Sequence, residues 1–205
     1  MKALVLVDVQ NDFMPGGVLE VPHGDLIVPV LNRVQPYFDL VTATQDWHPK
    51  NHVSFASNHP GMKPFERIML HGYDQVLWPD HCVQGTRGAQ FHPDLDTGRI
   101  AAIFRKGMNP EVDSYSGFND NMHIVSTGLS GYLKEKGITE LYVCGLAADI
   151  CVYYTIKDAV AEGFESALIE DGSRPLDEKN FGSVRTELGR MGVKIINSSQ
   201  ITDPS

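Results

Sequence analysis

The sequence has few basic residues. Its 205 residues include 17 lysines and arginines against 26 aspartates and glutamates, which gives a formal net charge of -9. No cluster of lysine or arginine occurs along the chain. Because nucleic-acid binding needs a basic surface that neutralises phosphates, this charge balance argues against a nucleic-acid partner.

The chain also lacks a long hydrophobic run. No segment approaches the roughly 18 consecutive apolar residues of a membrane span. The N-terminal stretch MKALVLVDVQ has a lysine and then five apolar residues, but Asp8 interrupts the longer apolar run that a secretory signal requires. We therefore predict a protein without a membrane partner and without a secretory signal.

Cysteine is scarce as well. The chain has three, Cys82, Cys144 and Cys151, and an odd number in a chain long enough to bury a core does not indicate a disulfide framework. We expect reduced thiols and a cytoplasmic protein. A composition with 42% hydrophobic and 21% charged residues is typical of a globular protein, and residues 1–205 are predicted to form a single domain.

Short apolar runs alternate with segments of helical periodicity. Runs that are apolar on both faces indicate strands covered by helices on each side. Between them, Gly163 is expected to end one helix and Asp177 to cap another that runs to Met191. The pattern predicts an α/β fold, a three-layer α/β/α arrangement around a mainly parallel six-stranded sheet that is Rossmann-like. The predicted strands are Ala3–Val9, Leu40–Gln45, Ile100–Arg105, Glu140–Gly145, Ser166–Asp171 and Val193–Asn197.

Polar side chains follow the ends of four of these strands. Asp8 closes the first, Asp46 and His48 follow the second, Lys106 follows the third and Cys151 follows the fourth. Parallel strands point their carboxyl ends toward one edge of the sheet, where ligands bind. We therefore expect an acid, a metal-type cluster, a cation and a thiol to meet at this edge.

The two neighbouring cysteines differ in setting. Cys144 lies within an apolar strand, where cysteine commonly serves as a small hydrophobic residue. Cys151 lies in the first turn of a helix, where free backbone N–H groups and the helix dipole are expected to stabilise a thiolate and lower its pKa. The alternative for Cys151 is a buried cysteine at a helix start, with no catalytic role.

Asp8 and Lys106 each have a structural alternative. Asp8 could cap a turn, a role for which Asp12 is an equal candidate. A rigid apolar strand also suits Asp8 as a buried proton acceptor whose pKa the environment raises. Lys106 could be an ordinary solvated lysine. Beside a thiol and a carboxylate, however, it would favour the thiolate.

Histidines gather in QDWHPKNHVSF and WPDHCVQGT. Asp46, His48, His52 and His81 form the type of ligand set that holds Zn²⁺, Fe²⁺ or Mn²⁺ with an open water position. Chance clustering among eight histidines is the alternative. Cys82 lies beside His81, but no second cysteine is spaced to join it, so we favour a structural role for Cys82.

Three aromatic residues lie in the neighbourhood of these groups. Phe13 follows Asp8, Trp78 precedes His81, and Tyr115 lies in a later polar stretch. Aromatic residues are more often part of a core. A setting beside candidate chemical groups suits them as walls for a flat aromatic ligand.

Long stretches of the chain carry a family resemblance. The sequence resembles the nicotinamidase (pyrazinamidase) branch of the isochorismatase-like hydrolases, with matching stretches in order across nearly the whole chain. These stretches are LVLVDVQNDFMPGGVLEVPHGD, TQDWHPKNHVSF, LWPDHCVQGTRGAQFHP, FRKGMNPEVDSYSGF and VCGLAADICVYYTIKDA.

The resemblance implies roles for individual residues. It implies a catalytic triad of Asp8, Lys106 and Cys151. It implies an oxyanion hole from the backbone N–H groups of Ala147 and Cys151, with a cis peptide bond between Leu146 and Ala147. The remaining implied residues are the metal ligands Asp46, His48 and His81, with His52 as an extra ligand in some members, and the aromatic wall of Phe13, Trp78 and Tyr115.

The activity implied by the resemblance is amide hydrolysis in NAD salvage. Nicotinamide would be converted to nicotinate and ammonia, and pyrazinamide to pyrazinoate, through a thioester on Cys151. The resemblance also implies one divalent metal ion, for which Zn²⁺ is the first candidate and Fe²⁺ and Mn²⁺ are the others. Isochorismatases do not need the cysteine, and N-carbamoyl amidases generally lack the metal set. An amidase for another small amide and a non-catalytic metal- or ligand-binding protein remain as alternatives. The oligomeric state stays open, with a homo-oligomer among the alternatives.

Overall fold

A six-stranded sheet forms the centre of the computed structural model, which describes residues 1–201. Its strand order is β5-β2-β1-β6-β7-β8, and all neighbouring strands in it pair in parallel. The predicted strands are confirmed, with shifts at their ends. Their bounds are β1 (Lys2–Val7), β2 (Leu40–Asp46), β5 (Ile100–Lys106), β6 (Glu140–Leu146), β7 (Glu165–Arg174) and β8 (Lys194–Ile196).

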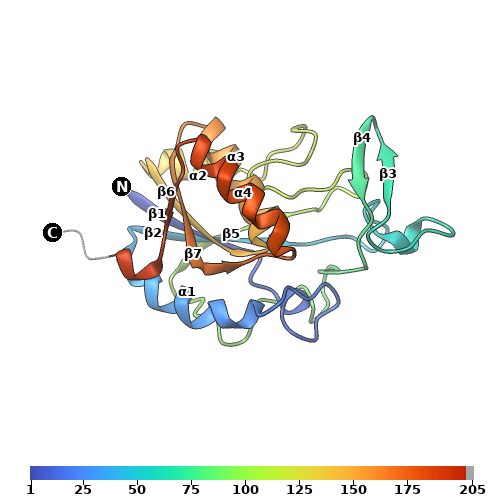
Figure 1. Ribbon diagram of the computed structural model, residues 1–205, viewed down its shortest axis with the longest axis horizontal. Coiled ribbons are helices and arrows are strands. Elements are labelled where there is room, and N and C mark those ends of the chain that lie inside the picture. The colour runs from blue at the N-terminus through green and yellow to red at the C-terminus, as the bar shows by residue number, and fades with distance from the viewer. Residues whose placement is uncertain (202–205) are drawn as a thin grey trace.

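Helices cover both faces of the sheet (Figure 1). On one face lies α1 (Val28–Val34), and on the other lie α2 (Leu129–Glu135), α3 (Tyr153–Ala161) and α4 (Glu178–Arg190). Alternate side chains of β1 enter the two cores, Leu4 and Leu6 on the α1 side and Val5 on the other. This arrangement confirms the three-layer prediction. None of the helices within residues 1–201 is long and apolar enough to cross a membrane.

Local sequence signals set the helix ends. The Asp177 side chain accepts hydrogen bonds from the backbone N–H groups of Lys179 (2.8 Å) and Asn180 (3.3 Å), so it caps α4 as predicted. After α3 the chain turns at Gly163, whose φ of +91° lies in the left-handed region that glycine adopts easily. Short 3-10 turns occupy Asn11–Phe13, Gly24–Ile27, Gln35–Tyr37, Ala56–Asn58 and Ser198–Gln200.

A glycine lets the central strands approach closely where they end. Gly145 of β6 has a φ of +127°, and a Cβ atom there would lie 2.1 Å from the carbonyl oxygen of Val7 in β1. Any side chain would therefore push the two strands apart. Asp8, the residue after β1, has a φ of 49°, and the chain turns at this point.

A separate hairpin stands away from the sheet (Figure 1). It consists of β3 (Arg67–Leu70) and β4 (Tyr73–Val76), which pair antiparallel. The sequence analysis missed this hairpin and α1. Each strand has only four residues, and the apolar run of β3, Ile68–Leu70, is shorter than the runs that identified the other strands.

Candidate active site

The ends of β2 and β5 place an acid and a cation side by side. Asp46 and Lys106, the last residues of these strands, are register partners in the parallel ladder. The Lys106 Nζ atom lies 2.8 Å from Asp46 Oδ1. The expectation that separate strand ends deliver their polar residues to one edge of the sheet is confirmed for this pair.

Lys106 joins the remaining members of the predicted triad. Its Nζ atom lies 3.0 Å from Asp8 Oδ2 and 3.5 Å from the Cys151 Sγ atom. It also donates a hydrogen bond of 2.9 Å to the carbonyl oxygen of Ser114. The Lys106 side chain is 0% exposed. This lysine is not the solvated residue of the alternative interpretation, because all four of its partners surround it inside the protein.

Thr44 fixes the second oxygen of Asp8. Its hydroxyl donates a hydrogen bond of 2.6 Å to Asp8 Oδ1, and the same Oγ1 atom accepts the backbone N–H of Asp8 at 3.2 Å. With Lys106 on Oδ2, the carboxylate is held on both oxygens. Asp12, the alternative turn-capping residue, instead accepts the backbone N–H of Cys82.

Cys151 lies in a π-helical turn, Ala148–Val152, that precedes α3. The carbonyl of Ala147 accepts the backbone N–H groups of Ile150 (3.0 Å) and Val152 (3.1 Å), which shapes this turn. The peptide bond between Leu146 and Ala147 is cis, as the resemblance implied. Cys144 is buried in β6, as expected for a packing residue.

Burial shifts the ionisation of the triad residues. It raises the pKa of the Cys151 thiol well above the ordinary value, and the charge of Lys106 only partly opposes this. The predicted lowering of the thiol pKa is therefore wrong, because a helix start inside the core is also a desolvated site. Burial likewise raises the pKa of Asp8 against the effect of Lys106. Burial would lower the pKa of Lys106, but Asp46 and Asp8 raise it far above the usual value.

Three predicted metal ligands converge next to Lys106. One ligand atom each from Asp46, His48 and His81 lies within 4.8 Å of the others, and all three residues are buried. The Nδ1 atom of His81 donates to the carbonyl oxygen of Pro79 at 2.8 Å, which leaves Nε2 free, 3.5 Å from Asp46 Oδ2. This arrangement fits a divalent cation, because two imidazole nitrogens and a carboxylate oxygen, which are ligand types of such ions, lie close together.

The electrostatics of these residues agree with that fit. Burial alone would raise the pKa of Asp46, but His48 and Lys106 hold it far below its usual range.

The backbone at Gly107 also belongs to the site, since its φ is +65° and a Cβ atom there would lie 2.6 Å from His48 Nε2. A glycine is therefore required where the chain leaves β5 and passes this imidazole.

His52 lies outside the first ligand group. It forms a second group with His48 and Asp113, and its ring centroid lies 4.4 Å from that of His48. Burial lowers the pKa of His52 to about 4. Its Nδ1 atom shares a hydrogen bond of 2.7 Å with the Ser54 hydroxyl. Cys82 belongs to neither group.

Asp113 was missed in the sequence analysis. Its Oδ1 atom lies 3.5 Å from His48 Nε2, and Oδ2 accepts a hydrogen bond of 3.1 Å from Gln75 of the β3–β4 hairpin. Burial would raise the pKa of Asp113, but His48 and His52 keep it far below the usual range. The only sequence signal was its place between Lys106 and Tyr115, since this irregular segment has no periodicity.

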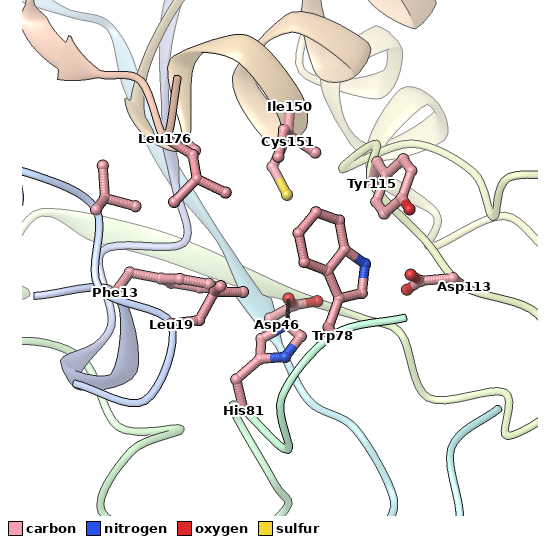
Figure 2. A pocket seen from close by; sticks show the side chains of 12 residues that line it. Phe13, Leu19, Asp46, Trp78, His81, Asp113, Tyr115, Ile150, Cys151 and Leu176 are labelled. Carbon is pink, nitrogen blue, oxygen red and sulfur yellow. Dashed lines mark ion pairs between the residues drawn. The ribbon is translucent and has the colours of Figure 1, made fainter. Parts of the chain in front are cut away.

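A cavity that is partly open to solvent lies above these groups. Figure 2 shows the Cys151 sulfur pointing into the space between the rings of Phe13 and Trp78, with Tyr115 beside Trp78. All three predicted aromatic residues thus line the cavity. The other lining residues are Leu19, Val21, Asp46, His81, Asp113, Ala147, Ile150 and Leu176.

Known proteins resemble this chain over nearly its whole length. Residues 2–196 match the isochorismatase domain family. The chain belongs to this family. The chain is similar to a curated protein from Acinetobacter baylyi that is named nicotinamidase. The two are 48% identical over 202 residues, which is 97% of this chain and 94% of that protein.

Solved structures of family members superimpose on the whole fold. A nicotinamidase pyrazinamidase from Acinetobacter baumannii has a TM-score of 0.95 and 48% identity, and the match covers 98% of both chains. A pyrazinamidase from Pyrococcus horikoshii in complex with zinc has a TM-score of 0.79 and 36% identity, with 96% of this chain and 98% of that chain covered. The isochorismatase-like fold predicted from the sequence is therefore confirmed.

Proposed function

We propose that this protein is an amidohydrolase that converts nicotinamide to nicotinate and ammonia, and that it also hydrolyses pyrazinamide to pyrazinoate. The observation that carries the proposal is the contact of one buried ammonium, Lys106, with Asp8, Asp46 and Cys151. This contact supports a site in which a base, a metal-type ligand set and a thiol act together. The names of the relatives, nicotinamidase and pyrazinamidase, support the same substrates.

Proton transfer from Cys151 to Asp8 begins the reaction. Burial keeps the thiol protonated, and it also makes Asp8 a stronger base than an ordinary carboxylate. Both groups contact Lys106, so the negative charge moves from the carboxylate to the sulfur while staying beside the same ammonium. The transfer therefore leaves the net charge of the buried cluster unchanged.

The thiolate then attacks the amide carbon. The backbone N–H groups of Ala147 and Cys151 serve as donors to the resulting oxyanion, and a donor of this kind contributes about 3 kcal/mol in other enzymes. Asp8 returns its proton to the amide nitrogen, ammonia leaves, and a thioester remains on Cys151. A water molecule, deprotonated by Asp8, cleaves the thioester to give nicotinate and restores the thiol.

The cavity suits a single flat ring. Phe13 and Trp78 lie on opposite sides of the Cys151 sulfur (Figure 2), and their faces can hold an aromatic ring by stacking and burial. Holding the carboxamide beside the sulfur in this way lowers the entropic barrier to attack. A divalent cation bound by Asp46, His48 and His81, with His52 as a further candidate, would supply a Lewis acid for the pyridine nitrogen.

Zinc is the cation that we propose for this site. Two histidines and a carboxylate are ligands that zinc accepts, and the Pyrococcus horikoshii pyrazinamidase was solved with zinc. Iron(II) and manganese(II) accept similar ligand sets and are the competing outcomes.

We further propose that the chain acts as a single domain in the cytoplasm, in NAD salvage.

Metal binding is tested independently of turnover. Metal-free protein should bind one zinc ion per chain in a chelator competition, and His81→Ala should weaken this binding by roughly 100-fold or more, because a direct ligand matters more than a supporting group. His92→Ala is the control, since His92 lies outside both ligand groups. Equal zinc affinity in wild type and His81→Ala would contradict the assignment.

The nucleophile is tested with a pair of cysteine variants. Cys151→Ala should reduce ammonia release from nicotinamide by roughly 10³-fold or more, because the thioester can no longer form. Cys144→Ala is the matched control, since Cys144 is buried in the adjoining strand away from the cavity. We expect it to retain activity with a lower melting temperature. Undiminished ammonia release by Cys151→Ala would exclude this residue as the nucleophile.

Asp8 as the base is tested by a pH profile. The hydrogen bond from Thr44 stabilises ionised Asp8 and so lowers its pKa. Thr44→Val, which keeps the shape of the side chain, should raise that pKa and move the acid limb of the kcat/KM profile upward by roughly one pH unit. An acid limb that stays in place or moves to lower pH would show that Asp8 is not the titrating base.

A further inference from the structure

A buried carboxylate next to the nucleophile has no role in the mechanism above. Asp149 is 4% exposed and lies in the same π-helical turn as Cys151. Its Oδ1 atom accepts the backbone N–H of Leu176 at 2.7 Å. Its Oδ2 atom accepts the backbone N–H of Asp177 at 3.1 Å and the Asn180 side-chain amide at 3.2 Å. All three partners are neutral N–H donors.

These hydrogen bonds connect the nucleophile turn to the loop between β7 and α4. Leu176, in that loop, lines the cavity together with Ile150, the residue after Asp149. Figure 2 shows the Leu176 side chain entering the cavity beside the Cys151 sulfur. The carboxylate of Asp149 therefore holds the backbone of one wall residue and is adjacent in sequence to another.

The wall residue that Asp149 holds is shared by two cavities. A second cavity, more open to solvent, is lined by four residues that also line the first, namely Trp78, Tyr115, Ile150 and Leu176. The outer cavity is also lined by Arg67 and Asp74, two exposed residues of the hairpin, and by Phe65, which precedes the hairpin. The aromatic residues Trp78 and Tyr115 and the aliphatic residues Ile150 and Leu176 thus lie between the inner site and the outer cavity.

Capping of α4 does not account for Asp149. The side chain of Asp177 already accepts the N–H groups of Lys179 and Asn180 at the start of that helix. Asp149 instead binds the backbone of the residue that enters the cavity and of its neighbour, Asp177.

We propose that Asp149 is a positioning residue that fixes Leu176 against the cavity and thereby restricts the site to amides of a single ring. This inference rests on the proposed hydrolysis of nicotinamide. Asp149 lines the outer cavity but not the inner one that holds the reacting groups, and it acts on specificity through the wall residue. When the anchor is weakened, the loop retreats and the opening admits a larger ring system.

The experiment compares two substrates that differ by one fused ring, nicotinamide and quinoline-3-carboxamide. Asp149→Asn keeps the shape of the side chain but turns an amide NH₂ toward N–H donors, so the anchor opens. The ratio of kcat/KM for nicotinamide to that for quinoline-3-carboxamide should fall roughly tenfold. The change should lie mainly in KM. A purely structural role would lower both substrates in proportion and leave the ratio unchanged.

Two further variants connect the effect to the wall residue. Leu176→Ala should lower the ratio by itself, and adding Asp149→Asn to it should produce no further change. Asp171→Asn is the matched control, because Asp171 of β7 also accepts a backbone N–H and a side-chain donor, both from Ser198, outside the cavities. It should keep the wild-type ratio.

The outcomes are distinguishable. An unchanged ratio in folded Asp149→Asn, or additive effects with Leu176→Ala, would overturn the inference. If Asp149→Asn does not fold, Asn180→Ala removes one of the three donors and should lower the ratio by roughly twofold, and an unchanged ratio there overturns it equally. Failure of the wild-type protein to hydrolyse nicotinamide would instead refute the proposed function.

Discussion

The buried ammonium of Lys106 is the interaction on which the site depends. It contacts Asp8, Asp46 and Cys151, which come from three different segments of the chain. Without it, two carboxylates would be buried near each other with no compensating charge, and removing one partner from a buried pair typically costs about 3–5 kcal/mol. The parallel ladder makes the contact obligatory, since Lys106 and Asp46 are register partners at the ends of their strands.

The same contact explains why the Cys151 thiol does not need a lowered pKa in the free protein. Burial disfavours a thiolate, and the nearby negative charge of Asp8 disfavours it further. Once Asp8 accepts the thiol proton, that charge disappears, and Lys106 then stabilises the sulfur while it stays paired with Asp46. The nucleophile is therefore generated when the proton moves, and the free site does not hold a reactive thiolate. A substrate that excludes water around these groups strengthens the electrostatic coupling.

The sequence predicted the parts of the site that lie at strand ends, because parallel strands bring their carboxyl ends together. Asp8, Asp46, Lys106 and Cys151 were found in this way. Asp113 and Leu176 were missed because they lie in irregular segments, where no period shows which side chain faces the cavity. The direction of the Cys151 pKa shift was wrong because a helix start is visible in a sequence, whereas its degree of burial is not. The β3–β4 hairpin was missed because its strands have only four residues each, so the apolar run of β3, Ile68–Leu70, is too short to identify a strand.

The central claim is that Asp8 and Cys151 compete for one ammonium, and ultraviolet titration of the Cys151 thiolate tests it most directly. The thiolate signal is measured in the wild type and in Asp8→Asn, each with the signal of its Cys151→Ala counterpart subtracted. Because the asparagine side chain carries no charge, the account predicts a lower pKa of Cys151 in Asp8→Asn than in the wild type. An equal or higher pKa in that variant would contradict the shared role of Lys106.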